Sequence, residues 1–111
     1  MKSFDLNKEL LGIVLKVEIQ ELEMSEYKEN HIRYFEHGKD YLLNVYELIN
    51  MMKEWASTKG YCIIQDTRGY TKVHCISSHA TKYWEDDEYS PSRVIDCCEW
   101  ILKREGIANE M

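Results

Sequence analysis

The chain has 111 residues and a mass of 13.3 kDa, which is the size of one domain. Its 20 Asp and Glu residues exceed its 14 Lys and Arg residues, and the formal net charge of −6 disfavours direct binding to nucleic-acid phosphates. The 44% share of apolar residues excludes a disordered chain, and no apolar run reaches the ~20 residues of a membrane span. We therefore expect a small, soluble, acidic protein of the cytoplasm that does not bind membranes.

A short helix is predicted over 3–15, where leucines recur at helical spacing. Ser3 and Asp5 are candidate N-caps, and Gly12 is expected to weaken or end the helix. Alternating apolar and charged residues then predict a half-buried strand over 15–24. The phase of this alternation slips part-way along, which indicates a bulge or the end of the strand.

A hairpin and a longer amphipathic helix follow. The hairpin is predicted over 31–43, because Gly38 can supply the positive φ that a tight turn requires. The helix is predicted over 45–59, with Asn44 as its N-cap and Gly60 as its left-handed stop. Its apolar residues recur with helical period and form the predicted buried face: Val45, Leu48, Ile49, Met52, Trp55 and Ala56.

The C-terminal half predicts strands and a closing helix. Strands at 61–65 and 70–77 flank a turn, and a third short strand is predicted at 80–84. The closing helix is predicted over about 91–104, with a buried face of Val94, Ile95, Cys98, Ile101 and Leu102. Hairpins that alternate with helices predict a single α+β domain over 1–111. Its antiparallel sheet would carry the two main helices on one face, beside the short N-terminal helix.

The cysteines and histidines raise the question of thiol or metal chemistry. Reduced thiols are expected, because no secretory segment is recognised. Cys97 is expected to lie beside the buried face of the closing helix and outside the core. A zinc site would draw on His74, Cys75 and His79. However, neighbouring residues of a strand point to opposite faces, and no paired metal-binding motif is present. No catalytic, cofactor or metal site is therefore predicted.

Acidic residues are concentrated in the segments 18–29 and 85–88. Such an excess either keeps a small domain soluble or marks a surface for a basic partner. Tyrosine and tryptophan side chains bracket the second segment, which is typical of a protein-binding surface, although Trp84 could instead fold over the edge of the sheet. The residues expected to contact a partner are Glu18, Glu21, Glu23, Glu26, Tyr83, Trp84, Glu85, Asp86, Asp87, Glu88 and Tyr89.

Two parts of the chain resemble a diffuse group of short phage and prophage proteins with no assigned activity. The first part is Asn44-Val-Tyr-Glu-Leu with Lys53-Glu-Trp-Ala and Lys59-Gly-Tyr, and the second is Ile95-Asp-Cys-Cys-Glu-Trp-Ile-Leu-Lys. Met51, Met52 and Cys97 depart from the pattern of that group. The resemblance implies an accessory protein of a mobile genetic element that works in a bacterial cytoplasm.

These observations lead to functions of different classes. The leading hypothesis is a non-enzymatic accessory protein that binds and occludes a host or defence-system protein with a basic surface, such as a bacterial nuclease or CRISPR-type system. A homodimer is left open. The alternatives are a small metal-dependent hydrolase and a nucleic-acid-binding module with the element order of a double-stranded-RNA-binding domain. The nucleic-acid alternative requires that Lys53, Lys59, Arg68, Lys72 and Lys82 converge on one face.

Overall fold

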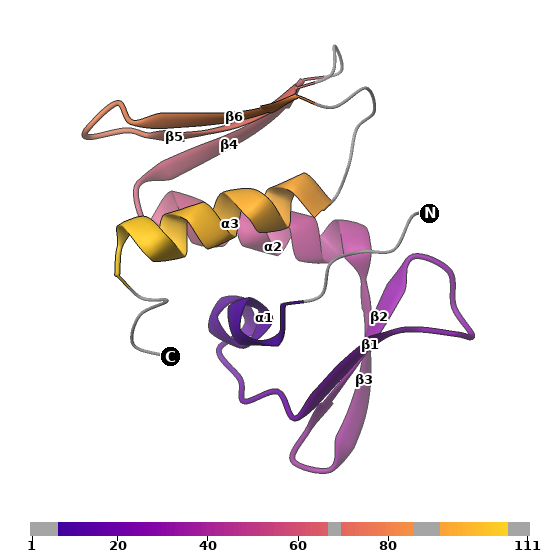
Figure 1. Cartoon of the computed structure of the whole chain (residues 1–111). Helices are drawn as coiled ribbons and strands as arrows, with labels where there is room; N and C mark the ends of the chain where they lie inside the picture. The colour runs from indigo at the N-terminus through magenta and orange to yellow at the C-terminus, as the bar shows by residue number, and fades with distance from the viewer. Residues whose placement is uncertain (1–6, 67–69, 86–91, 107–111) are drawn as a thin grey trace.

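The computed structural model describes residues 7–66, 70–85 and 92–106 (Figure 1). Its strands form two antiparallel three-stranded sheets, β1-β2-β3 and β4-β5-β6, and this arrangement confirms the predicted α+β class. The helices are α1 (Lys8–Leu15), α2 (Val45–Thr58) and α3 (Ser92–Arg104). The strands are β1 (Glu21–Met24), β2 (His31–Glu36), β3 (Lys39–Asn44), β4 (Tyr61–Asp66), β5 (Tyr70–Cys75) and β6 (Thr81–Glu85).

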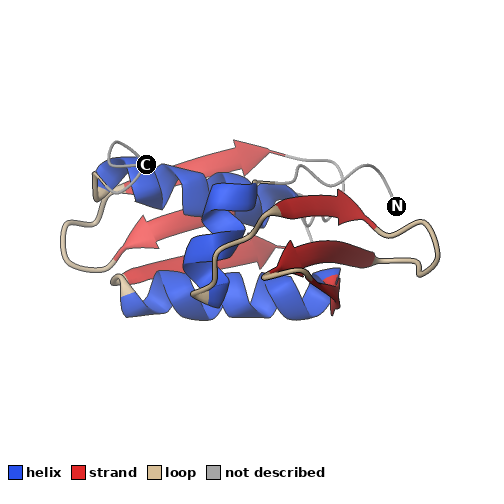
Figure 2. Cartoon of the chain, turned by 90° about the horizontal axis from the view of Figure 1, so that it is seen from below, coloured by secondary structure: helices blue, strands red, loops and turns tan. Residues whose placement is uncertain are grey.

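The elements are arranged in layers around α2. Helices α2 and α3 lie side by side against one face of the β4-β5-β6 sheet (Figure 1). Helix α1 and the β1-β2-β3 sheet lie on the other side of this helical layer (Figure 2). One hydrophobic cluster joins the layers and includes Leu10 of α1, Ile32 of β2, Met52 of α2 and Val73 of β5. The two sheets therefore share a core although they are not hydrogen-bonded to each other.

Helix α2 follows the sequence prediction at both ends. The side-chain oxygen of Asn44 accepts hydrogen bonds from the backbone N–H groups of Tyr46 at 2.8 Å and Glu47 at 3.3 Å. At the other end the chain leaves the helix through Gly60, whose φ is +85°. The whole predicted apolar face is buried, with Trp55 at 8% the most exposed of its members.

Helix α1 begins later than predicted and ends at the predicted residue. Its N-cap is Asn7, whose side chain accepts a backbone N–H at 3.0 Å; Ser3 and Asp5 lie outside the described residues. Of the two alternatives expected for Gly12, that it weakens or ends the helix, the second is wrong, because α1 continues to residue 15. A Cβ at position 12 would lie 3.0 Å from the backbone oxygen of Val17, so the glycine permits the chain to return closely past the helix.

The strand predicted over 15–24 is wrong in its first half. Leu15 is the last residue of α1, Lys16 adopts a left-handed φ of 59°, and β1 begins only at Glu21. The apolar residues that suggested a strand belong to a helix end and to a connection that both face the core, where Ile19 is buried. Three alternating apolar residues do not distinguish a strand from a helix end followed by a buried connection, because residues that face the core can produce this alternation in either structure.

Both predicted hairpins are present. In the first, His37 (φ 49°) and Gly38 (φ 76°) form a two-residue turn that pairs Glu36 with Lys39. Two positive φ angles are the signature of the type I′ turn, whose twist matches that of the flanking strands. In the second, β4 pairs with β5 and β5 pairs with β6; the turn residues 67–69 lie outside the described residues.

Helix α3 buries the predicted apolar face and one residue more. All members of that face are between 0 and 3% exposed. The prediction that Cys97 flanks the helix is wrong, because this residue is 0% exposed and belongs to the hydrophobic core. The two adjacent cysteines are both accommodated because α3 packs against α2 on one side and against β4 and β5 on the other.

Candidate protein-binding surfaces

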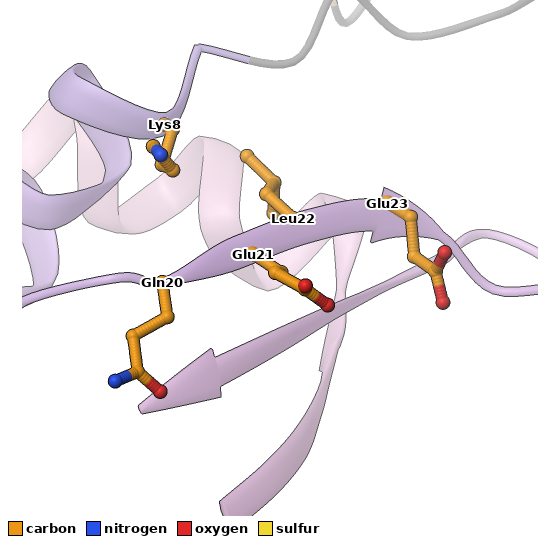
Figure 3. A pocket seen from close by; sticks show the side chains of 5 residues that line it. All are labelled: Lys8, Gln20, Glu21, Leu22 and Glu23. Carbon is orange, nitrogen blue, oxygen red and sulfur yellow. The ribbon is translucent and has the colours of Figure 1, made fainter. Parts of the chain in front are cut away.

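The β1-β2-β3 sheet turns one face toward the core and the other toward solvent. Leu22 rises on the side of α1, whereas Glu21 and Glu23 project from the opposite side of β1 (Figure 3). Cross-strand pairing continues this outer side across β2 and β3, since directly paired residues share a face. We call it the acidic sheet face; it comprises Glu21, Glu23, Arg33, Phe35, Asp40 and Leu42.

Arg33 holds the centre of the acidic sheet face together. Its Nη2 lies 2.8 Å from Oδ2 of Asp40, and its Nη1 lies 3.1 Å from Oε1 of Glu23. Its guanidinium carbon lies 4.7 Å from the centre of the Phe35 ring. The hydrogen bond to Asp40, followed by the charges of both carboxylates, raises the pKa of Arg33 above its usual value. Because carboxylates outnumber the guanidinium, the face remains negative while its side chains are held in place.

Apolar surface lies next to these charges. Leu42 is 52% exposed, and it is the cross-strand partner of Arg33. Glu18 and Glu26 are exposed beyond the two ends of β1, so the negative charge continues along this edge. A surface that combines carboxylates with an aliphatic group suits lysine and arginine side chains, which have an apolar stem and a cationic head.

A shallow hollow between α1 and β1 adjoins the acidic sheet face (Figure 3). The side-chain oxygen of Gln20 accepts a hydrogen bond from the backbone N–H of Gly38 at 3.3 Å, which ties this edge to the β2–β3 turn. Lys8 places an ammonium group on the rim, so the hollow is less acidic than the face itself. Its lining residues are Lys8, Gln20, Glu21, Leu22 and Glu23.

The described part of the second predicted contact segment, residues 83–85, lies on the other sheet, across the helical layer (Figure 1). Tyr83 is 59% exposed and points away from the helices. Trp84 points to the opposite side of β6, where it packs against the hydrophobic core. Of the two readings of Trp84, the structure therefore favours the one in which its ring folds over the sheet. Glu85 is exposed on the side of Tyr83, and Asp86, Asp87, Glu88 and Tyr89 lie outside the described residues.

The thiol of Cys75 lies in a polar cluster where β5 approaches the end of α3. Its Sγ is 3.5 Å from Oγ of Ser77, and Arg104 donates a hydrogen bond to Oγ of Ser78 at 3.4 Å. Hydrogen bonds from Ser78 and then Ser77 lower the pKa of Cys75 to about 6. His74 points to the other face of β5, so it does not form with this thiol the Cys–His pair that nucleophilic catalysis requires.

The other cysteines are in different surroundings. Burial raises the pKa of Cys97 to about 12 and raises the pKa of Cys98 as well, while Cys62 is exposed on the sheet. All four cysteines are free thiols in the structure. Among the described residues, no group of three or more His, Cys, Asp or Glu side chains is placed to hold a metal ion. The zinc alternative thus receives no support from this part of the chain.

Several residues of the acidic sheet face are not among those predicted from sequence. Arg33, Phe35, Asp40 and Leu42 come from β2 and β3, whereas the prediction considered the acidic segments alone. The signal that could have identified them is the turn at Gly38. A two-residue turn fixes the register of a hairpin, and that register places Arg33 opposite Leu42.

Comparison with known proteins finds no match among family models, curated proteins or solved structures. In the parts of the chain that the structure describes, no helix is both long enough and apolar enough to span a membrane.

Proposed function

We propose that this protein is a non-enzymatic accessory protein of a phage or mobile element that binds a basic surface of a host or defence-system protein and occludes it. In its concrete form, the partner is a nuclease or CRISPR-type system in the bacterial cytoplasm. The observation that carries the proposal is the acidic sheet face, where Glu21, Glu23 and Asp40 surround Phe35 and Leu42. Carboxylates steer a basic partner, and the apolar side chains exclude water after contact.

The geometry of the acidic sheet face reduces the cost of binding. Arg33 already holds Glu23 and Asp40 in fixed positions, so less side-chain freedom is lost when a partner arrives. The strands themselves are held by antiparallel pairing on both sides of β2. Glu85 belongs to the sheet on the far side of the helical layer. A flat partner surface that covers the acidic sheet face therefore does not reach it.

A charge-reversal pair tests the proposal. Glu21→Lys reverses a charge on the acidic sheet face, and Glu54→Lys makes the same change on the exposed side of α2. We expect tagged wild-type protein and Glu54→Lys to retain the same partner from a phage-infected bacterial lysate, identified by mass spectrometry, and Glu21→Lys to lose it. With purified partner, Glu21→Lys is expected to weaken binding about 10-fold and to make the affinity less sensitive to salt.

The comparison between the two variants separates a local effect from the change in net charge. Equal loss of binding in both variants would contradict a role of the acidic sheet face. Unchanged affinity of Glu21→Lys for a partner that wild-type protein retains would contradict the electrostatic mechanism. Circular dichroism checks that both variants are folded.

One observation favours nucleic-acid binding as a second candidate. The order α2-β4-β5-β6-α3, with both helices against one face of an antiparallel sheet, is also that of a double-stranded-RNA-binding domain. The described basic residues do not all lie on one face. Lys72 projects from the side of the sheet opposite to α2, whereas Lys53, Lys59 and Lys82 belong to the α2 side. Arg68 lies outside the described residues. A gel shift with double-stranded RNA at low salt tests this candidate. Retardation at micromolar protein would support it, and free RNA under those conditions would exclude it.

A further inference from the structure

The β4-β5-β6 sheet has a second face, on the side away from α2 and α3 (Figure 1). Cross-strand pairing places Ile64, Lys72 and Tyr83 in one row of this face. The next row toward one end contains Tyr70 and Glu85, and the next toward the other end contains His74. We call this surface the open sheet face.

The open sheet face exposes large apolar side chains. Tyr83 is 59% exposed and Ile64 is 39% exposed. The ring centres of Tyr70 and Tyr83 are 6.2 Å apart, and Nζ of Lys72 lies 5.9 Å from the Tyr83 ring centre, so these side chains form one continuous patch. Exposed aromatic and aliphatic groups on the uncovered face of a sheet are typical of a protein interface.

The charges of the open sheet face are arranged asymmetrically along the strands. The carboxylates of Asp66 and Glu85 occupy the row at one end, the ammonium group of Lys72 lies in the next row, and the imidazole of His74 lies in the row beyond it. His74 lies beside a second imidazole, since its ring centre is 5.7 Å from that of His79. Such a surface has acidic groups at one end and basic groups toward the other. It is complementary to a second copy that is rotated by 180° about an axis across the strands, because acidic groups then meet basic groups.

We propose that the open sheet face binds the same face of a second copy of this chain, as a two-fold symmetric dimer. When the strands of the two copies are aligned, the two-fold axis lies either along the strands or across them. An axis along the central strand β5 places Lys72 of one copy over Lys72 of the other, which is repulsive. An axis across the strands, between the row of Glu85 and the row of Lys72, exchanges these two rows. Each Glu85 then lies over Tyr83 of the other copy and beside its Lys72, and each Tyr70 lies over the other copy's Lys72. The charges therefore select the second arrangement.

The dimer is tested by sedimentation equilibrium over a range of micromolar concentrations. Wild-type protein is expected to show a reversible monomer–dimer equilibrium. Tyr83→Asp is expected to weaken the dimer at least about 10-fold, because it buries a carboxylate in an apolar contact. Tyr46→Asp is the matched control, since this tyrosine is 48% exposed on α2 and lies outside the open sheet face; its dimer is expected to equal that of wild type.

A charge-exchange series tests the orientation. Lys72→Glu and Glu85→Lys should each weaken the dimer, and the double variant should bind more tightly than either single variant, because it restores opposite charges across the two-fold axis. A wild-type protein that stays monomeric throughout would overturn the proposal. A dimer affinity that Tyr83→Asp leaves unchanged would also overturn the proposal. The same holds for a double variant that dimerises no more tightly than the single variants. If Tyr83→Asp fails to fold by circular dichroism, the charge-exchange series alone decides.

Discussion

Individual side chains in this protein owe their chemistry to their neighbours. Cys75 and Cys97 are both less than 10% exposed, yet their pKa values move in opposite directions. Serine hydroxyls donate hydrogen bonds that stabilise the thiolate of Cys75, whereas the surroundings of Cys97 in α3 lack water and bring the carboxylate of Asp96 close. The thiol environment is therefore set by which elements meet at each position.

The lowered pKa of Cys75 predicts selective alkylation. The rate of iodoacetamide modification at Cys75, measured by peptide mass spectrometry, should rise with pH through about 6 in the folded protein. Cys97 should remain unmodified at neutral pH. Cys62→Ser is the matched control and should leave the Cys75 profile unchanged. A midpoint at the ordinary thiol value of about 8.5 would contradict the role of the serine hydroxyls.

The same shift predicts a pH dependence of stability. The pKa of Cys75 is lower in the folded than in the unfolded chain, so the thiolate stabilises the fold above the ordinary thiol pKa, and this contribution disappears as pH falls through about 6. The difference in unfolding free energy between wild type and Cys75→Ser should therefore increase with pH between about 6 and the ordinary thiol value. Urea unfolding at several pH values measures it. A difference that is independent of pH would contradict the shift.

Each secondary-structure element owes its boundaries to a few local residues. α2 begins where Asn44 accepts two backbone N–H groups and ends at Gly60. α1 begins in the same way at Asn7 and ends at Lys16. Where such residues and a long apolar period occur together, as in α2, sequence alone located the element. Where the apolar period is short, as before β1, sequence alone did not locate the start of the element correctly.

The cap of α2 predicts a measurable loss of stability. Asn44→Ala removes the acceptor of the Tyr46 and Glu47 N–H groups and should lower the unfolding free energy by about 1 kcal/mol. Asn50→Ala is the matched control, because Asn50 is exposed within the same helix and alanine is the better helix former. Denaturant unfolding of both variants measures the difference. Equal stability of the two variants would contradict the capping role.

At the scale of the whole molecule, the described residues form one packing unit, in which two separate three-stranded sheets share a hydrophobic core. Its hydrophobic cluster runs from Ile32 in β2 through α2 and α3 to Val73 in β5. Because α2 contacts both sheets, loss of packing on one side is transmitted to the other. We therefore expect the chain to unfold in a single cooperative transition.

A substitution in the first sheet tests this cooperativity. Ile32 is 0% exposed, and Ile32→Ala should lower the unfolding free energy by about 2–5 kcal/mol. The three tryptophans lie in α2, β6 and α3, so their fluorescence reports on the part of the molecule away from the substitution. The fluorescence midpoint in urea should shift together with that of circular dichroism. Leu42→Ala, in the same sheet but 52% exposed, should change both little. An unshifted fluorescence midpoint would show that the sheets unfold separately.

Sequence by itself determined α2, α3, both hairpins and the α+β class, because periodic apolar residues, caps and turn glycines act over a few neighbouring positions. It also located the acidic segments, which are a matter of composition. The tertiary structure decided that Arg33 joins Glu23 and Asp40 in one face, that Tyr83 and Trp84 point to opposite faces of β6, and that Glu23 and Glu85 lie on different sheets. These properties depend on strand register and on layer packing, which are set by contacts between residues far apart in the chain.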